Sequence, residues 1–87
     1  MNREALKKEV LEALATVAPE LDAGTLLPNE PLREQLDLDS FDFLQFIIGL
    51  DRSFSLSIPE ADYGRLTTLD TLLDYLGEKL GSRPSGT

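Results

Sequence analysis

The stretch of residues 36–54 constrains the fold most, because it is too apolar for a helix with a single buried face. At about 100° per residue, the helix predicted here collects apolar side chains in two neighbouring arcs. The first arc consists of Phe43, Phe46, Ile47, Leu50 and Phe54, and the second of Phe41, Leu44 and Ile48. One arc can face a small core. The other must pack under more of the chain or be covered by a partner.

Ser40 stands at the predicted start of this helix, between the two arcs. Asp39 precedes it, and Asp42 follows Asp39 by three residues, which resembles a capping box with Asp in place of Glu or Gln. A helix start offers free N–H groups and the positive end of the helix dipole, so a phosphate ester on Ser40 would be well placed. An Asp-Ser pair is also an ordinary cap. Asp51 lies alone among apolar neighbours, and the continuous polar stripe consists of Asp42, Gln45, Gly49, Arg52 and Ser53.

The rest of the chain predicts further helices and no strand. Residues 3–17 form an amphipathic helix, and residues 18–38 form a long connection with a short helical turn near residues 30–35. Pro59 suits the start of a short helix over residues 60–63. The expected fold is all-α: a small four-helix bundle of three main helices and one short helix, with a long loop between the first two.

The end of the chain shows similar signals. Gly64 is expected to end the short helix, and Thr67 with Asp70 forms the expected box for the last helix. A stripe of leucines then leads to Gly81, a plausible C-cap. The predicted organisation is one helical domain over residues 1–81 and a disordered tail over residues 82–87.

The net charge of −8 is concentrated in residues 20–51, which hold eight acids and one base, Arg33. Such a surface either serves solubility or steers basic partners. It disfavours binding to nucleic acid or to an anionic membrane, since both would be repelled. No run approaches the ~18 apolar residues of a membrane span, and the charged N-terminus does not resemble a secretory signal, so a cytoplasmic protein is expected.

The side-chain inventory argues against an enzyme. The chain has no histidine and no cysteine, which removes the usual general base, the thiol nucleophile and the usual zinc ligands. The carboxylates of Asp37, Asp39 and Asp42 could in principle serve a metal-dependent hydrolase, but a chain this small has little room for a cleft. We predict no catalytic activity and no resident metal.

The residues around Ser40 resemble a known family. Residues 36–41 resemble the Leu-Gly-x-Asp-Ser-Leu signature of acyl and peptidyl carrier proteins, and the likeness extends in order over residues 3–80. It includes the Ile58-Pro59 turn and two further matches near the last helix. These matches are Thr67-Thr68-Leu69 and Asp74-Tyr75-Leu76.

This resemblance implies a monomeric carrier that holds an acyl or aminoacyl group on 4′-phosphopantetheine. A phosphopantetheinyl transferase, using coenzyme A and a magnesium ion, would attach the arm to Ser40, with Asp39 contacting the transferase or its metal. Loading ligases and downstream synthases or transferases would then dock on the helix that follows. The matching partner-binding positions are Phe41, Leu44, Gln45, Ile48, Asp51 and Arg52.

The departures from the family pattern favour a specialised member. Asp37 replaces the usual glycine, Gln45 replaces a glutamate, and Arg52 and Ser53 replace acids. The large rings expected in the core arc leave little spare volume, which favours a short or polar cargo. The alternative is a plain helical adaptor that binds a partner through the apolar face of residues 41–52.

Overall fold

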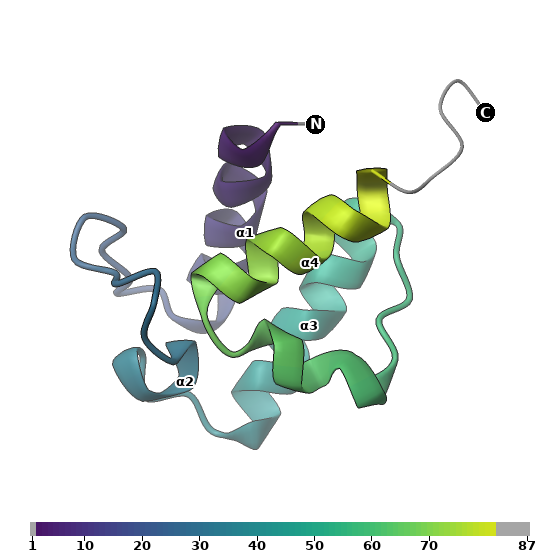
Figure 1. The fold of residues 1–87 in the computed structure, drawn as a ribbon. Coiled ribbons are helices and arrows are strands. Elements are labelled where there is room, and N and C mark those ends of the chain that lie inside the picture. The colour runs from purple at the N-terminus through teal and green to yellow at the C-terminus, as the bar shows by residue number, and fades with distance from the viewer. Residues whose placement is uncertain (1, 82–87) are drawn as a thin grey trace.

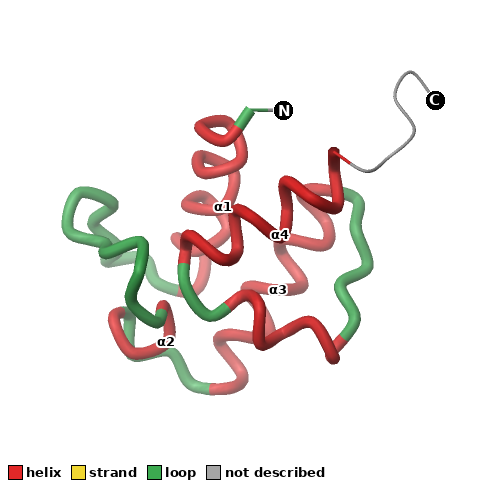
Figure 2. Tube along the Cα trace, viewed as in Figure 1, coloured by secondary structure: helices red, strands yellow, loops and turns green. Residues whose placement is uncertain are grey.

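The chain folds into five helical segments, which the computed structural model describes over residues 2–81 (Figure 1). No strand occurs among these residues (Figure 2), so the all-α prediction is confirmed. The predicted tail over residues 82–87 lies outside the described residues. The elements are α1 (Arg3–Val17), α2 (Leu32–Gln35), α3 (Ser40–Phe54), the 3-10 helix η1 (Glu60–Leu66) and α4 (Leu69–Gly81).

The first helix, α1, is fixed at its start by a side-chain cap. The Oδ1 atom of Asn2 accepts a hydrogen bond from the Ala5 N–H at 2.8 Å, which satisfies one of the donors that a first turn leaves unpaired. The helix packs mainly against α3 and also against α4. Gly49 lies at the crossing with α3, because a Cβ atom there would be 3.8 Å from the Ala13 Cβ. The predicted polar stripe is therefore interrupted at Gly49, which is half-buried.

The core is formed by one face each of α1, α3 and α4, closed by single residues from the connections. Four of the five residues of the first arc are buried, as predicted, whereas Phe43 is only half-buried. Burial of each large apolar side chain contributes roughly 1.5–3 kcal/mol. The buried residues are Leu6, Val10, Ala13, Leu14, Leu32, Leu38, Phe46, Ile47, Leu50, Phe54, Ile58, Leu66, Leu69, Leu72, Leu73, Tyr75 and Leu76.

The long connection between α1 and α3 is tied down by hydrogen bonds to its backbone. The Gln35 amide nitrogen donates to the carbonyls of Leu27 and Glu30 at 2.7 and 2.9 Å, and its oxygen accepts from the Leu27 N–H at 2.8 Å. Farther along, the Leu32 N–H donates to the Thr67 carbonyl, and the Asp70 N–H donates to the Pro28 carbonyl. The loop is thus fastened to both α2 and the start of α4.

Two boundaries differ from the sequence prediction. η1 continues past Gly64 to Leu66, because Gly64 does not take up the left-handed conformation that ends a helix and Leu66 is fully buried. The cap of α4 lies one residue later than predicted. The Thr68 Oγ1 accepts from the Thr71 N–H at 3.1 Å, while the Thr67 hydroxyl donates to the Gly64 carbonyl.

Candidate functional site

Ser40 is the first residue of α3, and its side chain is exposed. The preceding Asp39 is the N-cap, and its Oδ1 atom accepts the Asp42 N–H at 2.8 Å. The cap leaves the Ser40 hydroxyl beside the positive end of a 15-residue helix. α2, the start of α3 and η1 lie together at one end of the bundle (Figure 1).

Arg33 on α2 reaches the same hydroxyl. Its Nη2 atom lies 3.2 Å from the Ser40 Oγ, within donating distance. Its Nε donates weakly to the Leu38 carbonyl at 3.5 Å, and its guanidinium carbon lies 5.6 Å from the centroid of the Phe43 ring. A guanidinium over an aromatic face is attracted by the ring quadrupole. Arg33 therefore spans the link between α2 and α3 and presents a positive charge to Ser40.

The link between α2 and α3 has an unusual backbone. Asp37 has a φ of 53°, in the left-handed region that glycine enters without cost. The next residue, Leu38, is buried, and its N–H donates to the Arg33 carbonyl at 2.9 Å. The left-handed turn at Asp37 thus lets Leu38 enter the core immediately before the capping residue. Asp37 therefore replaces the glycine of the carrier signature at a position where the backbone conformation favours glycine.

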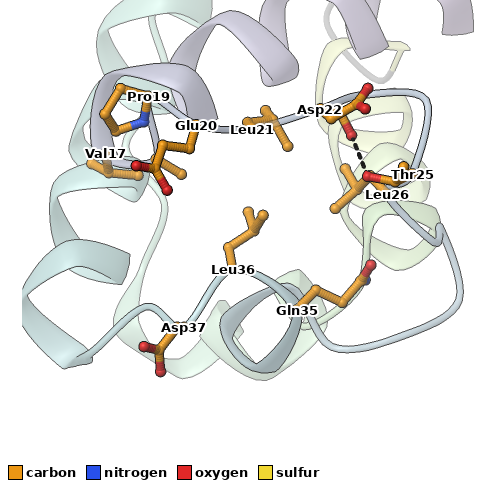
Figure 3. A pocket seen from close by; sticks show the side chains of 11 residues that line it. Val17, Pro19, Glu20, Leu21, Asp22, Thr25, Leu26, Gln35, Leu36 and Asp37 are labelled. Atoms are coloured by element: carbon orange, nitrogen blue, oxygen red, sulfur yellow. Dashed lines mark hydrogen bonds between the residues drawn. The ribbon is translucent and has the colours of Figure 1, made fainter.

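A surface hollow of about 690 Å³ lies beside the link between α2 and α3. Arg33 and Leu38 line it on one side, Phe43 lines it from α3, and Tyr63, Gly64 and Thr67 line it from η1 and the residue after it. A second hollow, of about 580 Å³, lies between the end of α1, the long loop and α2 (Figure 3). Leu36 projects into the second hollow (Figure 3), whose lining mixes apolar groups with carboxylates such as Glu20.

η1, which forms one wall of the first hollow, is held to α4 by Tyr75. The buried Tyr75 hydroxyl donates to the Asp62 Oδ2 at 2.7 Å. The Arg65 guanidinium and the Lys79 ammonium lie 5.0 and 5.5 Å from the centroid of the Tyr75 ring. Burial, followed by the hydrogen bond and the negative charge of Asp62, raises the pKa of Tyr75 to about 12. The hydroxyl therefore stays protonated and keeps donating at ordinary pH.

The second apolar arc lies open along α3. Phe41, Leu44 and Ile48 are 66, 42 and 36% exposed, so they do not pack under the long loop. Gln45 and Arg52 are exposed as well. Asp51 differs from the other predicted partner-binding residues. It is half-buried, and its Oδ1 accepts the Ile58 N–H at 3.1 Å, where it fixes the turn after α3.

Comparison with known protein families identifies the family to which this arrangement belongs. The model of the phosphopantetheine attachment site matches residues 8–76, most of the chain, with Ser40 inside the match. The chain belongs to the family of phosphopantetheine-binding carrier proteins. Members of this family carry a covalently attached group and are not themselves catalysts. The resemblance found in the sequence, the cofactor and the prediction of a non-enzyme are confirmed at this level.

Relatives of this carrier protein match over nearly their full length. It is 30% identical to the acyl carrier protein of Rubrobacter xylanophilus, over 90% of this chain and 95% of that one. It is also 30% identical to the acyl carrier protein of Thermosynechococcus vestitus, over 87% of this chain and 98% of that one. A solution structure from Anaplasma phagocytophilum, assigned to the acyl carrier proteins, matches with a TM-score of 0.77 at 30% identity. That match covers 91% of this chain and 92% of the other.

The residues at the start of α3 fit the family's cofactor. A phosphodiester on Ser40 would meet a helix N-terminus and the Arg33 guanidinium, both of which favour an anion. The arm ends in a thiol, a group that the chain lacks because it has no cysteine. Among residues 2–81, no three acidic side chains gather as a metal-holding group, and none of the helices there has the length and apolar composition needed to cross a membrane.

Reasoning from sequence missed three residues of this carrier's site and its supports. Arg33 was visible only as the single base among eight acids, and nothing in the pattern indicated that it would reach Ser40. Gln35 carried no signal, because its partners are backbone atoms of a loop whose course was unknown. Tyr75 was noted only as part of the family likeness. It is 13 residues from Asp62, and no local sequence pattern indicated that its hydroxyl would donate to that carboxylate.

Proposed function

We propose that this protein holds an acyl or aminoacyl group as a thioester on 4′-phosphopantetheine attached to Ser40, and presents it to partner enzymes. The observation that supports this most directly is the exposed Ser40 hydroxyl at the capped start of α3, inside the matched family region. The chain's own role is to hold that hydroxyl in place and to offer a rigid surface beside it. Its partners are a phosphopantetheinyl transferase, a loading ligase and downstream synthases or transferases.

The test is intact mass after incubation with coenzyme A, magnesium and a broad-specificity phosphopantetheinyl transferase. A gain of one phosphopantetheine is expected in the wild-type protein and not in Ser40→Ala. Because the capping side chain is that of Asp39, the alanine variant keeps the cap and should fold like the wild type. No gain from several transferases, with a folded protein, would contradict the proposal and favour the adaptor alternative.

We propose a second role for Asp39, in contact with the transferase or its magnesium ion. One carboxylate oxygen of Asp39 caps α3, and the side chain as a whole is exposed next to Ser40. Asn caps helices about as well as Asp but carries no charge. Asp39→Asn therefore separates the two roles: a slower transfer reaction at unchanged stability would support a role for the charge.

The exposed strip of Phe41, Leu44 and Ile48 is the proposed docking surface for partner enzymes, with Gln45 and Arg52 at its edge. A single exposed apolar side chain is ordinary, but a contiguous strip of large ones marks an interaction site. Together with the thinned acidic character of this helix, the strip supports a specialised carrier: one of a secondary-metabolite or polyketide pathway, or one that carries an unusual acyl chain or an aminoacyl group. Loading assays with candidate ligases test the proposed specialisation. Efficient turnover of this carrier by housekeeping fatty-acid synthase enzymes would contradict it.

The cargo that we propose is short or polar. Phe46 and Phe54 are buried and occupy the core arc of α3, which leaves little room for a long acyl chain among the helices. NMR spectra of the protein loaded with cargoes of increasing length provide the test. Signals of the buried core should not depend on cargo length. Progressive shifts of those signals with chain length would overturn the proposal.

A further inference from the structure

We infer that Arg33 is a built-in counter-ion for the phosphodiester of the arm and sets the direction in which the arm leaves Ser40. This inference rests on the proposed attachment at Ser40. It assigns a positioning role to a residue outside α3 and outside the docking strip. The Nη2 atom of Arg33 lies 3.2 Å from the Ser40 Oγ, the atom to which phosphorus would be bonded. The non-bridging phosphate oxygens would be bonded to that phosphorus, two bonds from Oγ, so they come within reach of the same guanidinium.

The surrounding charges make Arg33 the sole candidate on this part of the chain. It is the only base among residues 20–51, and three carboxylates stand close to Ser40 in sequence, at Asp37, Asp39 and Asp42. Unopposed, these acids would repel a phosphodiester. Among residues 2–81, Arg33 has no carboxylate within ion-pair distance, and it contacts a carbonyl, a hydroxyl and a ring instead. Its charge is therefore not already matched by an acid.

Arg33 is also held in position before any arm is attached. The Phe43 ring supports one face of the guanidinium, and the Leu38 carbonyl accepts from Nε. A planar guanidinium fixed in this way loses little further freedom when it binds an anion, and its fork matches phosphate geometry. The Ser40 hydroxyl marks the place where the anion would form.

The position of Arg33 has a directional consequence. Arg33 and Phe43 both line the hollow between α2 and η1, while Phe41, which begins the docking strip, lies at a different angle around α3. A phosphodiester drawn toward Arg33 would start the arm on the side of the hollow. The strip of Phe41, Leu44 and Ile48 would then stay uncovered for a partner enzyme.

The test compares apo and phosphopantetheinylated protein by NMR. Attachment, checked by intact mass, should shift the Arg33 Nε–Hε signal. In the loaded Arg33→Gln variant the ³¹P signal of the phosphodiester should move from its wild-type position. Lys8→Gln is the control, because it removes one positive charge from an exposed position on α1, outside the proposed docking surface. In the wild type, about 1 M salt should move the ³¹P signal toward that of the Arg33 variant, since it shortens the screening length to about 3 Å.

The possible results separate this inference from the proposed function. No mass gain would overturn both. A mass gain with an unchanged Arg33 signal in the wild-type protein would overturn the counter-ion role alone, and this comparison does not depend on how well any variant folds. Equal ³¹P shifts in the Arg33 and Lys8 variants would also overturn it, because a general loss of charge would then explain the effect.

Discussion

The bond between Tyr75 and Asp62 provides the most quantitative prediction, because it makes stability depend on pH in an unusual range. The hydroxyl is buried, and it donates to a half-buried carboxylate at 2.7 Å. Burial and Asp62 together raise the pKa of Tyr75 to about 12, from 10.0 for an exposed tyrosine. The folded protein therefore holds this proton more tightly than the unfolded chain does.

The sign and size of the effect follow from this difference. The stabilisation is complete below pH 10, the pKa of the unfolded tyrosine, and is lost as the pH rises toward 12. One pKa unit corresponds to about 1.36 kcal/mol, so this shift corresponds to roughly 2–3 kcal/mol. At neutral pH, Tyr75→Phe removes a hydrogen bond to a charged acceptor. It should cost about 1.5 kcal/mol, or a Tm lower by about 6–12 °C for a domain of this size.

The assay is chemical unfolding followed by circular dichroism, from pH 7 to pH 11.5, with Tyr63→Phe as the control. Tyr63 is half-buried on the same 3-10 helix, and its removal takes away a hydroxyl without touching the pair. Wild type and Tyr63→Phe should lose stability together above pH 10, and Tyr75→Phe should lose less. If the stability gap between wild type and Tyr75→Phe stays constant across this range, the reasoning about Tyr75 is wrong.

Three further outcomes are expected from single substitutions. Asp39→Ala should lower the free energy of unfolding by about 1 kcal/mol through loss of the cap, whereas Asp39→Asn should leave it nearly unchanged; equal losses in urea titrations would contradict the capping role. Phe41→Ser should change stability by no more than about 0.5 kcal/mol but weaken capture by a cognate partner enzyme; unchanged affinity in calorimetry would remove it from the docking surface. Phe46→Ala should cost about 3–5 kcal/mol and leave the domain largely unfolded by circular dichroism, and a cooperative native-like melt would show that the core tolerates the cavity.

Much of the fold follows from patterns that are local in the sequence. The 3.6-residue periodicity indicated α1, α3 and α4, because each buries one face, and the bounds of α1 and α3 agree with the prediction. The errors arise where tertiary contacts outweigh local signals. Gly64 resembles a helix stop, yet η1 continues to the buried Leu66. Thr67 resembles a cap, but its carbonyl and hydroxyl are used by Leu32 and Gly64, so Thr68 caps α4 instead.

The candidate site shows the same contrast between local sequence signals and tertiary contacts. Ser40 and Asp39 could be placed at a helix start because a cap and its helix are neighbours in sequence, whereas their proposed role came from the family resemblance. Phe43 was assigned to the core by its angle around the helix, but that angle does not reveal that α2 brings a guanidinium to its outer face. Arg33 is seven residues from Ser40, and between them Asp37 turns the chain with a positive φ. Periodicity carries no information about such a turn.

The manner in which Gln35 fastens the long loop has a consequence for how this protein can diversify. All three hydrogen bonds of its side chain are to main-chain atoms, of Leu27 and Glu30, so the fastening does not depend on which side chains the loop displays. Every amino acid except proline offers the same donor and acceptor. Exposed loop positions such as Glu20 and Asn29 are thus free to change without loosening the scaffold around Ser40. The loop surface of such proteins can therefore diverge widely in sequence while the scaffold that holds Ser40 keeps its shape.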